Sequence, residues 1–136
     1  MNTNNTNSED RKTLFYPELS YKITGLCFEV HNELGRYARE KQYADFIEDK
    51  LKETELSFKR EQRIGESGNI LDFVIQDRIV LEIKAKKHLL KEDYYQIQRY
   101  LQCTHLKLGL LINFRNRYLK PKRIIRIETD AKIKFL

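Results

Sequence analysis

Apolar residues in the first third of the chain repeat at the three- and four-residue spacing of a helix. This spacing predicts helices over residues 18–34 and 38–53. The first stripe consists of Ile23, Leu26, Cys27, Val30 and Leu34, and the second of Tyr43, Ala44, Ile47 and Leu51. Gly35 suits the end of the first helix, because glycine readily adopts the left-handed conformation that terminates helices.

The rest of the chain carries shorter apolar runs, which are typical of strands. They predict strands at 57–64, 70–75, 79–85, 107–114 and 123–127, with one helix at 91–102. The run at 107–114 is almost continuously apolar, as in a strand that is covered on both faces. The order of helix, helix, three strands, helix, strand and strand predicts an α/β fold with a mixed β-sheet flanked by helices.

The segment DFVIQDRIVLEIK, residues 72–84, reads as a hairpin with a polar turn at 76–78. If Ile75 lies opposite Ile79, the register places Asp72 opposite Glu82. Side chains alternate along a strand, so Asp72, Glu82 and Lys84 would then share one face of the sheet. A tighter two-residue loop would instead pair Asp72 with Ile83 and separate the two acids.

Two carboxylates beside an ammonium can bind a divalent cation and stabilise a phosphate-centred transition state. Glu82 and Lys84 could equally form a cross-strand ion pair on a solvated face, and Asp72 could cap a turn. Glu40 is another unusual carboxylate, since it stands at the head of the apolar stripe of the second helix. Its alternative role is to stabilise the helix dipole from the first turn.

The 136 residues fit one domain, which we place at 14–128 between a disordered polar tail at 1–13 and a short tail at 129–136. No apolar run is long enough to cross a bilayer, and residues 1–12 do not resemble a secretory signal. The two cysteines suit neither a zinc site nor a disulfide framework. A reducing, cytoplasmic setting is therefore expected.

Positive charge is concentrated in the last third of the chain. The net charge is +6, made up of −2 for residues 1–93 and +8 for residues 94–136. Such asymmetry is typical of proteins that bind polyanions. The candidate nucleic-acid-binding residues are Arg99, Arg115, Arg117, Lys120, Lys122 and Arg123.

Several short motifs occur in a fixed order. They are Glu29-Val30-His31, Glu33-Leu34-Gly35, Glu40 with Tyr43, Asp72, Leu81-Glu82-Ile83-Lys84-Ala85, Gln96 with Tyr100, and Leu108-Gly109-Leu110-Leu111-Ile112-Asn113-Phe114. Together they resemble the PD-(D/E)XK nuclease superfamily, which has a restriction-endonuclease-like core, and within it the small GxxExxY family. The resemblance covers residues 18–128, and the Gln-x-x-x-Tyr pair is similar to that of RecB-type members. Tyr37 stands where the GxxExxY pattern has glycine, which could close the turn differently and shift Glu40.

The resemblance implies a metal-dependent nuclease. Asp72, Glu82 and the backbone carbonyl of Ile83 would hold Mg²⁺ or Mn²⁺, and Lys84 would orient the attacking water or stabilise charge on the phosphate. The substrate would be nucleic acid, taken here as DNA, bound with little sequence preference. The rival is an inactive nucleic-acid-binding or scaffold module of the same fold.

The helices would complete the site. By the same resemblance, Glu40 would add a metal ligand or support a second metal. Gln96 would position Lys84 or the substrate, with Tyr100 bracing it, although both residues could also form a packed polar stripe. Nothing in the sequence resembles a base-reading helix or an aromatic platform, so any selectivity is expected for ends, flaps or single strands, or to come from a partner. A homodimer and a protein partner both remain compatible with the sequence.

Overall fold

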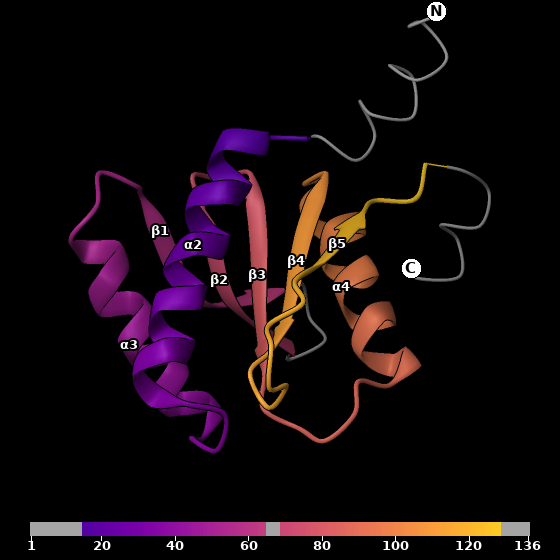
Figure 1. Ribbon diagram of the computed structural model, residues 1–136. Coiled ribbons are helices and arrows are strands. Elements are labelled where there is room, and N and C mark those ends of the chain that lie inside the picture. Colours follow the sequence, from indigo (N-terminus) through magenta and orange to yellow (C-terminus); the bar gives the residue numbers. More distant parts are fainter. Residues whose placement is uncertain (1–14, 65–68, 129–136) are drawn as a thin grey trace, which may run out of the picture.

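Helices and strands follow one another in the order predicted from the hydrophobic pattern. The computed structural model describes residues 15–64 and 69–128 (Figure 1). The elements are α2 (Pro17–Leu34), α3 (Glu40–Lys52), β1 (Phe58–Ile64), β2 (Asn69–Ile75), β3 (Ile79–Lys84), α4 (Lys91–Thr104), β4 (Leu108–Asn113) and β5 (Lys122–Ile125). The tails expected at 1–13 and 129–136 lie outside the described residues.

The five strands form one mixed sheet in the order β1-β2-β3-β4-β5. Only β3 and β4 run parallel, and α4 is the connection between them. The other neighbours are antiparallel. The α/β architecture predicted from the sequence is therefore confirmed.

The sheet is covered on both faces (Figure 1), by α2 and α3 on one side and by α4 on the other. The core on the α2–α3 side is the larger one. From the sheet it takes Phe73, Ile75, Ile79, Leu81, Ile83, Leu108, Leu110, Ile112 and Phe114. The core on the α4 side takes Val74, Val80, Leu111 and Ile124 from the sheet and Ile97, Tyr100 and Leu101 from the helix.

The hairpin adopts the predicted register. Phe73 pairs with Leu81 and Ile75 with Ile79. The turn occupies residues 76–78, and its first two residues have φ values of 56° and 52°. The tighter two-residue loop is thereby excluded, and the two acids fall on one face of the sheet.

Some helix boundaries differ from the predicted ones by two residues. Helix α3 begins at Glu40 rather than at residue 38, because the backbone of Arg39 is still extended, with φ −89° and ψ 157°. Helix α4 continues to Thr104 rather than 102 and ends where His105 adopts a left-handed conformation. Gly35 caps α2 with φ 75°, as predicted. None of the helices in the described ranges is long and apolar enough to span a membrane.

Gly109 allows α4 to lie close to the sheet. A Cβ atom at this position would come within 2.7 Å of Ile97 Cγ2 on α4. Glycine therefore removes a clash between β4 and α4 and brings the side chains of the helix within reach of the strand ends.

Candidate active site

Strands β2 and β3 part at the level of Asp72. The last regular backbone pair is Phe73 with Leu81. Beyond it, the Asp72 amide donates to Glu82 Oε1 at 2.9 Å, and the Ile83 amide donates to Asp72 Oδ2 at 2.7 Å. Each carboxylate therefore replaces a backbone carbonyl of the ladder, which fixes the two acids side by side.

The pairing of β2 with β1 is also interrupted at this level. Arg60 pairs with Phe73 and Gln62 with Leu71, while Glu61 between them has a φ of 57°. A left-handed backbone is costly for a residue other than glycine, and such conformations cluster at functional sites. Asp72 thus lies where β2 leaves regular pairing on both sides.

Burial raises the pKa of both carboxyl groups. Glu82 is only 3% exposed. Burial, followed by the charge of Asp72, raises the pKa of Glu82 to about 8. Burial is also the main cause that raises the pKa of Asp72 to about 6, against the lowering effect of the Ile83 amide. Two ionised carboxylates here repel each other in a poorly solvated place, and a cation bound between them would relieve that cost.

Lys84 lies among three acceptors without a short contact to any of them. Its Nζ atom is 3.8 Å from Glu82 Oε2, 3.9 Å from Asp93 Oδ1 and 3.4 Å from Gln96 Oε1. An ammonium carries three donors. Lys84 can therefore turn a proton toward a phosphate oxygen or a water while its charge stays balanced by neighbouring carboxylates.

Asp93 is a site residue that was not predicted from the sequence. Its carboxylate accepts hydrogen bonds from the Leu90 amide at 2.7 Å and from Lys86 Nζ at 3.0 Å. Although burial by itself raises the pKa of Asp93, these two donors hold it below the usual value. The available signal was spacing, since Asp93, Gln96 and Tyr100 fall on one face of a helix.

Gln96 and Tyr100 lie on α4 facing the carboxylates, as the predicted pairing requires. Burial, and then the charges of Glu82 and Asp72, raise the pKa of the Tyr100 hydroxyl. That hydroxyl also donates to the Ile70 carbonyl at 3.3 Å, so it braces β2 just before Asp72. Gln96 is the residue of this pair that contacts Lys84 directly.

Asn113 holds the loop after β3 and was likewise not predicted. It pairs with Lys84 across the parallel strands. Its Nδ2 donates to the Lys86 carbonyl at 2.7 Å, and its Oδ1 accepts from the Lys86 amide at 3.1 Å. These two hydrogen bonds to the backbone of Lys86 fix the segment that carries Lys84 and Lys86.

Glu40 is the exposed first residue of α3. Its charge helps to raise the pKa values of Asp72 and Glu82. Within residues 15–64 and 69–128, however, no three His, Cys, Asp or Glu side chains gather closely enough to hold one metal ion. The ligand role of Glu40 stays a prediction, and the described site consists of two carboxylates.

The predicted nucleic-acid-binding residues come from three parts of the fold. Arg115, Arg117 and Lys120 lie in the loop after β4, Lys122 and Arg123 lie on β5, and Arg99 is exposed on α4. Arg123 donates to Ser20 Oγ at 2.7 Å and to the Phe15 carbonyl at 3.0 Å. Its guanidinium therefore connects β5 to the start of α2.

A hollow of about 750 Å³ lies away from the carboxylates, between α2 and the end of α3. Its charged side chains include Glu29 and Lys50, which approach each other to 3.6 Å. The hollow contains no comparable group of perturbed acids, so the candidate site is the pair on β2 and β3.

A family model described as the PD-(D/E)XK nuclease superfamily matches residues 17–127. No curated protein and no solved structure matches the chain. The match spans the paired acids, Lys84 and α4, and with the mixed sheet it confirms the restriction-endonuclease-like core, while membership of the GxxExxY family stays a prediction. The chain therefore belongs to the PD-(D/E)XK nuclease superfamily.

Proposed function

We propose that this protein is a metal-dependent nuclease that hydrolyses phosphodiester bonds in DNA with little sequence preference. The observation that carries the proposal is the arrangement of Asp72 and Glu82, buried side by side on adjacent strands with Lys84 beside them. The nuclease superfamily to which the chain belongs supports the reaction class.

The two acids fit a hard divalent cation. Each carboxylate commits one oxygen to a backbone amide, so these two hydrogen bonds do not use Asp72 Oδ1 or Glu82 Oε2, the latter of which lies 3.8 Å from Lys84 Nζ. Mg²⁺ is commonly held by one or two carboxylates together with water and substrate phosphate. Asp72, Glu82 and the carbonyl of Ile83 would hold Mg²⁺ or Mn²⁺, which would supply a water of lowered pKa and neutralise charge on the phosphate.

The remaining residues orient the substrate and the water. Lys84 donates to the attacking water or to a non-bridging phosphate oxygen, because its contacts within the protein are long. Asp93 and Gln96 act as positioning residues that keep the ammonium between α4 and the metal-binding pair. Glu40 adds negative charge at the same edge of the sheet and is proposed to bind the ion through water.

DNA binding is proposed to rest mainly on phosphate contacts from Arg99, Arg115, Arg117, Lys120 and Lys122. Such contacts lose affinity steeply as salt rises and carry little sequence information. We also place the chain in the GxxExxY family and in the cytoplasm. The location is proposed from the cysteine pattern of the sequence, which suits no disulfide framework.

A second function has one specific observation in its favour. Both carboxylates bond backbone amides, so they could serve only to join β2 to β3 in a non-catalytic nucleic-acid-binding module. That module requires no metal. Metal binding therefore separates the two candidates.

The decisive experiment measures cleavage of labelled single- and double-stranded DNA with Mg²⁺, Mn²⁺ or EDTA. Wild-type protein is compared with Lys84→Ala, and Lys52→Ala serves as the matched control because Lys52 is exposed and lies on the far end of α3. We expect metal-dependent cleavage by the wild type and the control, and a loss of at least about 100-fold in Lys84→Ala.

Calorimetric titration of Mg²⁺ and Mn²⁺ into wild-type protein, Asp72→Asn and Glu82→Gln completes the test. Saturable binding that both substitutions abolish supports the nuclease. If the wild type neither binds metal nor cleaves, while it still binds DNA, the nuclease proposal is wrong and the binding module takes its place.

A further inference from the structure

Two arginines that are 79 positions apart in the sequence hold each other in place at one end of the molecule. Arg36 Nε donates to the Arg115 carbonyl at 2.9 Å, and Arg115 Nε donates to the Arg36 carbonyl at 3.2 Å. Each guanidinium is therefore fixed through its Nε atom, and these hydrogen bonds do not use its two terminal nitrogens. A fixed guanidinium loses less entropy on binding a ligand than a free one.

Tyr37 lies between these arginines. The guanidinium carbons of Arg36 and Arg115 are 5.1 Å and 5.6 Å from the centre of its ring. Tyr37 is nevertheless 74% exposed. Both guanidiniums lie over the ring, yet most of the Tyr37 surface stays open to solvent, which leaves aromatic surface beside two cations for a ligand to contact.

Tyr43 fixes the turn that carries Tyr37 through two hydrogen bonds to the backbone of the turn. Its hydroxyl donates to the Gly35 carbonyl and accepts from the Ala38 amide at 3.2 Å. The Tyr43 ring stacks on Phe114, with 4.4 Å between the ring centres. Since Phe114 directly precedes Arg115, both halves of the arginine pair rest on one buried aromatic contact.

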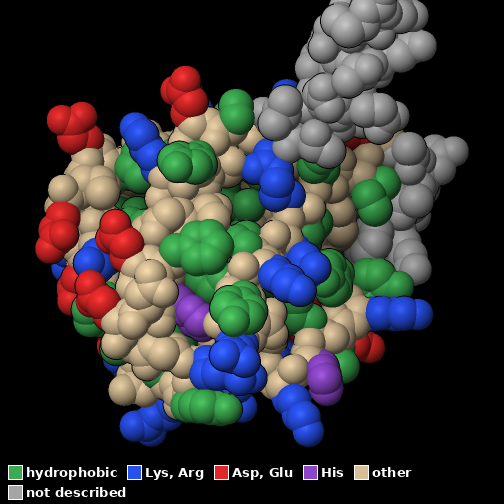
Figure 2. Space-filling view, in the orientation of Figure 1, with side chains coloured by type: hydrophobic (Ala, Val, Ile, Leu, Met, Phe, Trp, Pro, Cys, Tyr) green, Lys and Arg blue, Asp and Glu red, His purple; other side chains and the backbone are tan. Residues whose placement is uncertain are grey.

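Arg36, Tyr37 and Arg115 are called the arginine–tyrosine cluster below. Its two cations are not neutralised. Neither arginine forms an ion pair with a carboxylate within the part of the chain that the structure describes. By contrast, Arg60 contacts both Asp45 and Glu48. Figure 2 shows basic side chains gathered toward the lower end of the molecule and acidic ones toward the left, over the region of α3.

We propose that Arg36, Tyr37 and Arg115 form a binding site for an unpaired nucleotide, whose base stacks on Tyr37 while its flanking phosphates contact the two guanidiniums. The protein then prefers a single strand or a frayed end over an intact duplex. The site goes beyond the phosphate contacts of the proposed nuclease, and it names that enzyme's substrate class if the nuclease proposal holds.

The chemistry favours an unpaired base over other anionic ligands. A free phosphate or a lipid headgroup needs the two guanidiniums but gains nothing from an open ring between them. In a duplex the bases stack on one another and expose only their edges, so an exposed tyrosine can stack only on a base that has left the helix.

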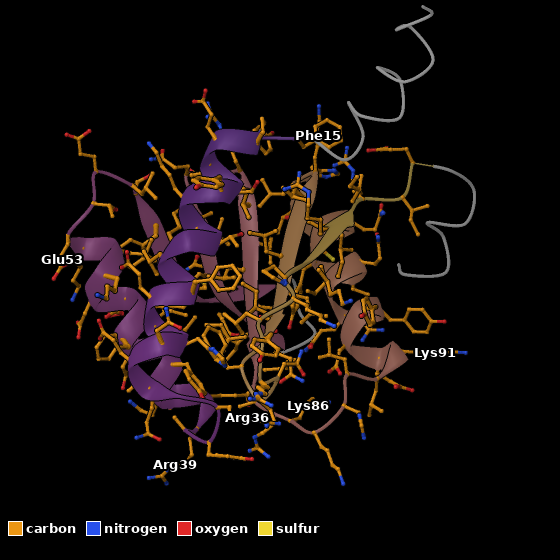
Figure 3. All side chains as sticks on the ribbon, viewed as in Figure 1. Phe15, Arg36, Arg39, Glu53, Lys86 and Lys91 are labelled. Atoms are coloured by element: carbon orange, nitrogen blue, oxygen red, sulfur yellow. The ribbon has the colours of Figure 1, made fainter. Side chains whose placement is uncertain are left out.

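The cluster and the paired acids belong to the same end of the sheet. The turn of Tyr37 leads into Glu40, whose charge acts on Asp72 and Glu82. The loop of Arg115 follows Asn113, which pairs with Lys84. In Figure 3, Arg36 and Lys86 are both labelled toward the same end of the molecule, and Lys86 is two residues beyond Lys84 in the sequence.

The test is binding of a fluorescent oligothymidylate in EDTA at ~150 mM salt, where weak exposed contacts are screened. We expect Tyr37→Ala to weaken binding about 5- to 100-fold, since stacking of one base contributes ~1–3 kcal/mol. Tyr37→Phe keeps the ring and should bind like the wild type. Tyr21→Ala is the matched control, because Tyr21 is 81% exposed and lies near the start of α2.

Two further ligands separate stacking from charge. A duplex of equal length and an abasic oligomer of equal charge should bind more weakly, and Tyr37→Ala should change neither. The proposal is overturned if Tyr37→Ala binds oligothymidylate like Tyr21→Ala, if all three ligands weaken equally, or if anionic vesicles compete better than oligothymidylate. Because EDTA prevents metal-dependent cleavage, these outcomes stand apart from success or failure of the nuclease proposal.

Discussion

The two faces of the sheet differ most along β3. On the α2–α3 face, Ile79, Leu81 and Ile83 are fully buried among other apolar side chains. On the α4 face, the strand begins with the buried Val80 but continues with Glu82 and Lys84. One strand thus contributes a hydrophobic core to one face and a charged site to the other.

The difference indicates that the apolar side chains of β3 stabilise the fold on one face, while its charged side chains form the candidate site on the other. The burial of apolar side chains on the α2–α3 face favours folding. The burial of two like charges on the α4 face opposes it, because ionised groups lose solvation there. Apolar burial compensates for the cost of the buried acids, so neutralising an acid should have an effect on stability opposite in sign to that of truncating an apolar side chain.

The largest effect is expected on the apolar face. Leu81→Ala should lower the free energy of unfolding by ~2–5 kcal/mol, because it removes a fully buried side chain and leaves a cavity. Urea denaturation measures this loss. If the variant does not fold, Ile83→Val provides a smaller change of ~0.5–1.5 kcal/mol. A smaller loss in Leu81→Ala than in Lys84→Ala would contradict the division between faces.

A substitution at the base of the α4 face should disturb both stability and the site. Gly109→Ala places a methyl group 2.7 Å from Ile97 Cγ2, and we expect a cost of ~1–3 kcal/mol. Since α4 carries Asp93 and Gln96, its displacement should also reduce cleavage or DNA binding. Adding Ile97→Leu to Gly109→Ala removes the Cγ2 methyl that clashes with the new Cβ atom, and it should restore part of the stability and part of the cleavage or DNA binding. If neither recovers, the clash with Ile97 is not the cause of the loss.

At the acids themselves, the sign should reverse. The pKa of Glu82 is raised by burial to about 8 in the folded protein, so the folded state holds its proton more tightly than the unfolded state. Stability in EDTA should therefore be greatest below the ordinary pKa of a glutamate and fall as pH rises toward 8. Asp72, with a pKa raised to about 6, acts in the same direction.

Glu82→Gln removes this charge and keeps an acceptor for the Asp72 amide. We expect the variant to be more stable than the wild type by ~1–2 kcal/mol at pH 9 in EDTA, with the difference vanishing near pH 4. Thermal unfolding across pH checks this. Added Mg²⁺ should stabilise the wild type but not the variant. A variant that is less stable at every pH would assign Glu82 a purely structural role.

The smallest effect is expected outside both faces. Lys59 and Asp77 form an ion pair of 3.5 Å between side chains that are 61% and 77% exposed. Such pairs contribute little, so Lys59→Ala should change the free energy of unfolding by no more than ~0.5 kcal/mol. Chemical denaturation gives the baseline against which the other variants are judged, and a loss above 1 kcal/mol would mean that burial is a poor guide to stability here.

Much of the candidate site could be predicted because its pattern is local. Alternation along the hairpin limited the register to two alternatives, and the pairing of Ile75 with Ile79 in the structure selects the one that places Asp72 and Glu82 on one face. Asp93 escaped prediction, because an acid in the first turn of a helix usually serves the helix dipole. Its real contacts depend on how α4 is rotated and how closely Gly109 lets it approach the sheet.

By itself, the sequence determined the order of elements and limited the hairpin to two registers, of which the structure adopts the one that places both acids on one face. These features follow from the periods of side chains along a strand or helix, which act over a few residues. Only the tertiary structure decided that Arg115 bonds to Arg36 and lies over the ring of Tyr37, and that Lys86 contacts Asp93. Such contacts join separate segments across the packed sheet, and no local period specifies which distant segments will meet.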